Sequence, residues 1–140
     1  MVQGVLWVDP TNKDLYLRDA ASAFQKLTHR QLSKSFVIET PVATDDIPVW
    51  RTDVAITLVE THYLSFGGTN WVGQLQEYNS NGASGVDTQT SDSTATAGTD
   101  VEVTSFSNAA IAAGNYLGIK TTSISGTPTL LVVTFIYTED

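Results

Sequence analysis

Imidazole is the side chain that most often moves protons near neutral pH, so the two histidines are the first candidates for chemistry. His29 lies in a polar stretch without a clear period, whereas His62 lies in a run rich in Val, Ile, Thr and aromatic residues. Strand alternation sets Glu60 and His62 on one face, where the carboxylate would orient the imidazole as a base. An exposed polar strand position explains the same pair without chemistry.

No nucleophile elbow, phosphate-binding loop, zinc-protease helix or dinucleotide fingerprint accompanies these histidines. The many Ser and Thr residues have no partner base nearby in the sequence. We therefore expect no catalytic residue and no enzyme activity.

Three carboxylates bracket the long polar connection over residues 79–99, and they are the candidates for a metal site: Asp87, Asp92 and Asp100. Hard cations such as Ca²⁺ take carboxylate and carbonyl oxygens from loops of this kind. The spacing is not that of an EF-hand, and acidic loops rich in Ser and Thr are usually solvated. The chain also has no cysteine, which leaves no thiolate ligand and no disulfide. We expect no metal and no cofactor.

Tryptophans at loop edges are candidates for stacking on sugar rings. Trp71 follows a GGTN turn, and Trp50 ends the segment IPVW. Tryptophan more often covers a core while its N–H finds one polar partner. Trp71 is kept as a possible ligand contact, together with the 79–99 connection.

Most of the chain reads as strands. Seven runs rich in Val, Ile, Thr and aromatic residues are separated by Gly, Asn, Asp and Pro turn signals, and no segment has a sustained helical period. The runs cover residues 36–40, 47–51, 54–66, 71–78, 101–106, 116–122 and 130–137. We predict an all-β fold over residues 36–140. An antiparallel jelly-roll sandwich is favoured and an immunoglobulin-like sandwich is the alternative.

A small unit precedes this domain. Residues 4–9 and 14–19 read as strands joined by a Pro-Asn turn, residues 24–28 as a possible third strand, and residues 29–35 as a linker. Two or three short strands are marginal alone in water. Residues 1–35 are therefore predicted to form a β-meander arm that leans on a partner.

The charge of the chain is unevenly distributed. The net charge is -8, yet residues 1–51 hold equal numbers of acidic and basic residues, and Lys120 is the only base after them. An acidic protein does not neutralise phosphates, which argues against nucleic acid as a partner. No apolar run is long enough for a membrane span or a signal peptide. We expect a soluble protein made in a cytoplasm, with no membrane partner.

The segment TLLVVTFIY, residues 129–137, is apolar on both faces of the strand that it predicts. One face belongs to the core, so the other needs a cover, and a second copy of the chain is the commoner solution. We expect a homo-oligomer. The interface is assigned to four alternating residues: Leu131, Val133, Phe135 and Tyr137.

Three segments carry a resemblance to a known family: DDIPVWRTDVAIT, SFSNAAIAAGNYL and the ending SGTPTLLVVTFIYTED. Residues 36–140 resemble a jelly-roll module of tailed-bacteriophage virion proteins, and GVLWVDPTNKDLYLRDA is similar to the N-terminal meanders of phage fibre and decoration proteins. These segments contain packing and turn residues, and no catalytic residue is carried over.

The resemblance implies a homotrimeric capsid decoration, or cement, protein on the outer capsid surface of a virion, bound to the major capsid protein. The alternative is a tail-fibre or receptor-binding module that recognises host carbohydrate. With the first reading, the arm contacts the shell through residues of its two clearest strands: Val5, Trp7, Leu15, Tyr16 and Arg18.

Overall fold

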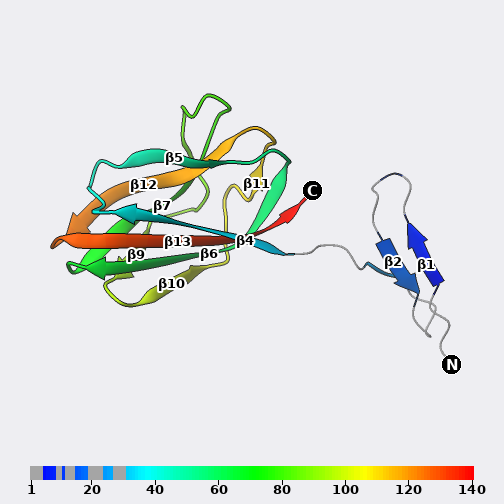
Figure 1. The fold of residues 1–140 in the computed structure, drawn as a ribbon, viewed down its shortest axis with the longest axis horizontal. Helices are drawn as coiled ribbons and strands as arrows, with labels where there is room; N and C mark the ends of the chain where they lie inside the picture. Colours follow the sequence, from blue (N-terminus) through cyan, green and yellow to red (C-terminus); the bar gives the residue numbers. More distant parts are fainter. Residues whose placement is uncertain (1–4, 9–10, 12–14, 19–23, 27–30) are drawn as a thin grey trace. The chain divides into compact units, whose positions relative to one another are not determined.

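The computed structural model describes residues 5–8, 11, 15–18, 24–26 and 31–140, and these residues contain strands and no helix (Figure 1). The chain divides into two compact units, Met1–Arg30 and Gln31–Asp140. The boundary therefore falls before residues 31–35, which the sequence assigned to the arm and linker.

The first unit contains a three-stranded antiparallel sheet with the order β1-β2-β3. The strands are β1 (Val5–Val8), β2 (Leu15–Arg18) and β3 (Phe24–Lys26). Trp7 lies opposite Tyr16 in the β1–β2 register. Sequential strands paired in chain order make a meander, as the turn signals predicted.

The second unit contains ten strands in two antiparallel sheets. One sheet has the order β10-β6-β13-β4, with β11 also paired to β6, and the other has the order β5-β12-β7-β8, with β9 also paired to β7. The strands are β4 (Leu32–Glu39), β5 (Asp46–Arg51), β6 (Ile56–Gly67), β7 (Asn70–Tyr78), β8 (Val86–Asp87), β9 (Ser93–Thr96), β10 (Asp100–Val103), β11 (Ala110–Ile111), β12 (Tyr116–Ser125) and β13 (Pro128–Glu139).

The pairing is nested along the chain. The first strand of the unit pairs with the last, β4 with β13, and then β5 pairs with β12, β6 with β10 and β7 with β8. The strands β4 to β7 therefore alternate between the two sheets, and the pairing places segments far apart in sequence side by side in one sheet (Figure 1).

One hydrophobic core lies between the sheets and draws on both. From Leu130 to Thr138, β13 alternates strictly, with one side chain buried and the next half-buried. Its buried set meets buried residues of β6, β7 and β12, so each sheet covers the apolar face of the other. The fully buried large side chains include Tyr63, Trp71, Leu75, Leu117, Ile119 and Phe135.

One turn and one edge strand show how the sequence selects this geometry. Gly67 and Gly68 have φ values of 70° and 62°, which suit glycine at the tight connection between β6 and β7. Pro48 lies on β5, an edge strand, where it removes no central hydrogen bond, beside a bulge at Gly118.

Residues 32–35 belong to β4 and are not a linker. Ser33 and Ser35 are exposed, and Lys34 occupies a position opposite Phe135 that alternation would give to an apolar residue. Lysine placed there is one way in which an edge strand avoids further pairing. Because of this polar composition, residues 32–35 were not predicted to form a strand.

Candidate functional site

The expected interface residues on β13 are not on the surface. Leu131, Val133 and Phe135 are fully buried in the chain's own core, and Tyr137 is 5% exposed. A side chain without exposed area cannot contact a second copy, so this assignment was wrong. The alternation was read correctly, but the two faces of β13 were exchanged.

The opposite face of β13 is the one that remains accessible. Val132 lies between Val37 of β4 and Leu64 of β6, and Leu130 lies next to Phe66. Val37 is 54% exposed and Phe66 is 41% exposed, while the other three are half-buried. We call these five residues the apolar band.

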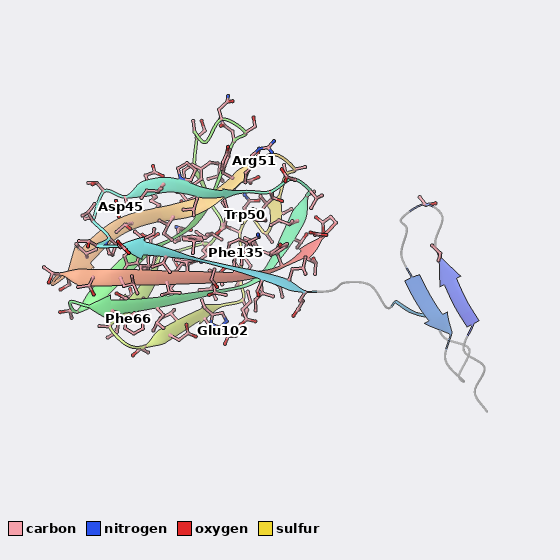
Figure 2. All side chains as sticks on the ribbon, in the orientation of Figure 1. Asp45, Trp50, Arg51, Phe66, Glu102 and Phe135 are labelled. Carbon is pink, nitrogen blue, oxygen red and sulfur yellow. The ribbon has the colours of Figure 1, made fainter. Side chains whose placement is uncertain are left out.

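Acidic residues flank the apolar band on the outer face of the same sheet. Asp100 of β10 lies opposite Leu64, and Glu102 lies opposite His62. Figure 2 shows Phe66 and Glu102 on this sheet, on β6 and β10. The outer face therefore combines an aliphatic surface with carboxylates.

His62 links two of these carboxylates. Its Nδ1 lies 2.7 Å from Asp100 Oδ2, and its Nε2 contacts Glu60 Oε1. Neutral imidazole has one N–H, so only the imidazolium donates to both acceptors. His62 therefore ties β6 to β10 most strongly when it is protonated. The expected placement of Glu60 and His62 on one face of the strand is confirmed.

The hydrogen bond to Asp100 raises the pKa of His62, and the contact with Glu60 adds to the rise, while partial burial acts in the opposite direction. A group whose pKa is higher in the folded state stabilises the fold below its unfolded pKa, near 6.5, and loses that contribution as pH rises through the folded pKa. The cluster has no nucleophile within the contacts described, and its geometry is that of an ion-pair network.

The three carboxylates proposed as possible ion ligands have separate partners. Asp92 accepts a hydrogen bond from Gln74 at 2.7 Å, Asp87 accepts one from Gln76, and Asp100 contacts His62. Among residues 31–140 and the other described positions, no cluster of His, Asp or Glu has a geometry for a metal ion.

Trp71 is not accessible to a ligand. Its exposed fraction is 0%, its ring stacks on Tyr63 at 5.2 Å, and its Nε1 donates to Thr121 Oγ1 at 2.8 Å. The single polar partner satisfies the indole N–H in the core. The suggestion of a ligand contact at Trp71 was wrong.

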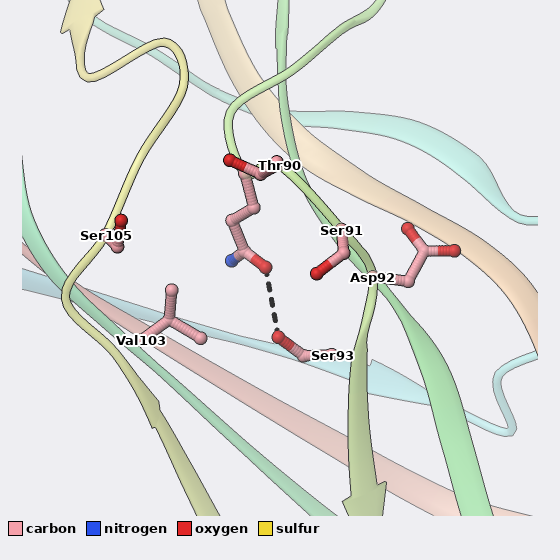
Figure 3. Close-up of a pocket in the computed structure, with 7 residues that line it drawn as sticks. Thr90, Ser91, Asp92, Ser93, Val103 and Ser105 are labelled. Atoms are coloured by element: carbon pink, nitrogen blue, oxygen red, sulfur yellow. Dashed lines mark hydrogen bonds between the residues drawn. The ribbon is translucent and has the colours of Figure 1, made fainter.

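A polar pocket of about 280 Å³ lies beside the 79–99 connection (Figure 3). Gln89 forms its buried side. The Gln89 amide donates to Tyr63 Oη, and its Oε1 accepts from Ser93 Oγ at 3.0 Å. The remaining lining is mostly hydroxyl-bearing: Thr90, Ser91, Asp92, Val103 and Ser105. Because the Gln89 amide is already paired within the protein, this pocket offers no unsatisfied buried group to a ligand.

The five residues expected to contact a shell lie on β1 and β2 in the first unit. Val5 is opposite Arg18, Trp7 opposite Tyr16, and Val8 opposite Leu15. Their backbone strands are present as expected. Their side chains lie outside the described part of the chain, so the attachment assignment stays a prediction.

Comparison with protein-family models and with curated proteins gives no match. Within the described positions, no helix has the length and apolar character that crossing a membrane requires.

One pocket of the second unit was not predicted from the sequence. Lys34, Trp50 and Tyr137 come from three different strands and line one pocket. An unusual signal did exist in the sequence, namely a lysine at an inward-facing position of β4. It was hidden because β4 was not expected to start before Phe36.

Proposed function

We propose that the chain is a virion structural protein, a capsid decoration or cement protein of a tailed bacteriophage. In this proposal the Gln31–Asp140 unit is a jelly roll and the Met1–Arg30 unit attaches to the assembled shell. The chain is a homotrimer on the outer capsid surface, and its partner is the major capsid protein.

The nested strand pairing is the observation that carries the proposal. A jelly roll is a long antiparallel ribbon rolled into two sheets, in which the first strand pairs with the last and each inner pair follows in order. The pairs β4–β13, β5–β12, β6–β10 and β7–β8 follow that rule. Viral shell proteins are among the proteins that use this topology.

The apolar band favours assembly with other copies. Val37, Leu64, Phe66, Leu130 and Val132 form neighbouring positions on three strands and remain partly exposed. Such a surface indicates an interaction site. We assign the copy-to-copy contact of the proposed trimer to this band, in place of the buried face of β13.

The mechanism follows from mass action. A protein that binds only the assembled shell lowers the free energy of that state, by about 2.7 kcal/mol per site when its free concentration is one hundred times the dissociation constant. Attachment by a small separate unit leaves the larger, acidic unit solvated. The carboxylates and the small number of bases in residues 52–140 fit such an outward position.

The test is sedimentation with shells of the virus that encodes the chain. The full chain is expected to sediment with assembled shells and to raise their melting temperature, but not to bind free capsid subunits. A Trp7→Ala, Tyr16→Ala double variant is expected to lose binding. A Glu102→Gln variant on the second unit serves as the matched control. Failure of the full chain to sediment with shells would refute the proposal. Binding by the double variant would show that Trp7 and Tyr16 are not the attachment residues.

A further inference from the structure

A second pocket lies between the edge strands β4 and β5, at the open side of the second unit. Its volume is about 250 Å³, and it is lined by residues of β4, β5, the segment after β5, and β13. Six of its lining side chains are aromatic or charged: Lys34, Trp50, Arg51, Asp53, Tyr137 and Glu139. None of them belongs to the apolar band or to the first unit.

The aromatic wall of the pocket is held in place by the core. The Trp50 ring lies 5.4 Å from the ring of Phe135 and 5.6 Å from the ring of Tyr137, measured between centroids. Figure 2 shows Trp50 beside Phe135, between the two sheets. Trp50 is only half-buried, so part of its surface faces the pocket. A fixed aromatic surface binds the apolar face of a ring with little loss of side-chain entropy.

Charged groups at this pocket are unusual for this unit. Residues 31–140 contain three basic side chains, and two of them, Lys34 and Arg51, line the pocket. Lys34 Nζ lies 5.2 Å from the centroid of the Trp50 ring. Asp53 and Glu139 bring two carboxylates to the same rim, so the formal charges cancel.

This balance selects the class of ligand. Because two bases face two carboxylates, the pocket has no net charge with which to favour an anion or a cation. A neutral molecule with many hydroxyl groups uses both kinds, because each hydroxyl donates to a carboxylate and accepts from an ammonium or a guanidinium. A sugar also has one apolar ring face of C–H groups that fits an aromatic side chain.

The rim is organised before any ligand arrives. Arg51 Nη1 donates to Asp53 Oδ1 at 2.8 Å, which places a donor and an acceptor side by side. Between them, Thr52 is 1% exposed, its N–H donates to Asn115 O at 3.0 Å, and its carbonyl accepts from Gly114 N–H at 2.7 Å. A pre-formed rim lowers the ordering cost of binding.

We propose that the pocket between β4 and β5 binds a neutral saccharide, with one sugar ring against Trp50 and its hydroxyls on Lys34, Arg51, Asp53 and Glu139. The pocket is slightly smaller than the ~300 Å³ at which sites for drug-sized ligands begin, so it suits the end of a glycan. This activity goes beyond shell decoration and does not depend on it.

The experiment screens the full chain on an array of neutral and acidic glycans, and measures affinity for the best neutral hit by titration calorimetry. Asp53→Ala and Arg51→Ala alter side chains that are 87% and 48% exposed, so both variants are expected to fold. Each is expected to weaken binding at least tenfold, as is Trp50→Leu. Asp92→Ala, at the other pocket, is the matched control and is expected to bind as the unaltered chain does.

Binding of a neutral glycan that is lost in Asp53→Ala and retained in Asp92→Ala supports the site. The proposal is overturned if the full chain binds no neutral glycan, if only acidic glycans bind, or if Asp53→Ala and Arg51→Ala bind unchanged. Trp50→Leu is interpreted only with a circular dichroism spectrum that matches the unaltered chain. None of these measurements uses shells. A negative glycan-binding result would therefore not bear on the decoration proposal, which the sedimentation experiment tests separately.

Discussion

Aspartate at either of two adjacent positions on β13 should have opposite consequences. Val133 is fully buried between the sheets, whereas Val132 lies in the apolar band. Val133→Asp loses the burial of a valine side chain, about 2 kcal/mol. It also places a carboxylate in the core without a partner, which costs several kcal/mol more. The sum is comparable with the whole stability of a small domain, about 5–15 kcal/mol.

Val132→Asp keeps the carboxylate at a hydrated surface. Its cost to folding is the loss of a β-favouring residue and of half-buried contacts, on the order of 1 kcal/mol. If the apolar band joins copies of the chain, this variant is also expected to dissociate into folded monomers. The two variants have the same composition, so any difference between them comes from the face alone.

Urea unfolding followed by circular dichroism and tryptophan fluorescence measures this difference, and light scattering gives the oligomeric state. We expect Val133→Asp to be unfolded in buffer and Val132→Asp to unfold cooperatively near the midpoint of the unaltered chain. A Val133→Asp protein within about 1 kcal/mol of the unaltered chain would refute the assigned faces of β13. Val132→Asp that keeps the oligomer intact would refute the apolar band as its interface.

Two further outcomes are expected. His62→Gln should lower the free energy of unfolding by about 0.5–1.5 kcal/mol at pH 5.5 and much less at pH 9. The pKa of His62 is raised in the folded state, so its ion pairs with Asp100 and Glu60 form at low pH and are lost when the imidazole deprotonates. An equal loss at both pH values in urea titrations would contradict this. Gly118→Ala should lower the melting temperature by several degrees, since an added Cβ would lie 2.0 Å from the carbonyl oxygen of Ile47; a calorimetric scan without a shift would show that the strands separate freely there.

The sequence predicted the elements well because strand composition and turn residues are local signals. The runs ending at Arg51, Phe66 and Tyr78 correspond closely to β5, β6 and β7. The start of β4 was missed because an edge strand with two exposed serines and a lysine has the composition of a loop. Such positions are decided by pairing with β13, which is far away in the sequence.

The face of β13 was not predictable by the same reasoning. Leu130 and Val132 are as apolar as Leu131 and Val133, so composition does not distinguish the faces. Packing decides, since the ring of Phe135 meets Trp50 of β5 in the core. The β4–β5 pocket has the same origin, because it is made of residues that are neighbours only after the two sheets have closed.

The pairing of the first and last strands of the second unit also determines how the unit carries load. β4 and β13 are antiparallel, and Leu32 lies opposite Tyr137, so the chain enters and leaves the unit at the same end. Tension between Gln31 and the C-terminus would separate these two strands one hydrogen bond at a time, as a zipper opens. The pull on Asp140 also reaches β6, because β13 pairs with that strand as far as Glu139 opposite Ile56. A protein fused after Asp140 would therefore be attached at the same end of the unit as the first unit. A force between the two would act along the direction in which strand pairs separate most easily.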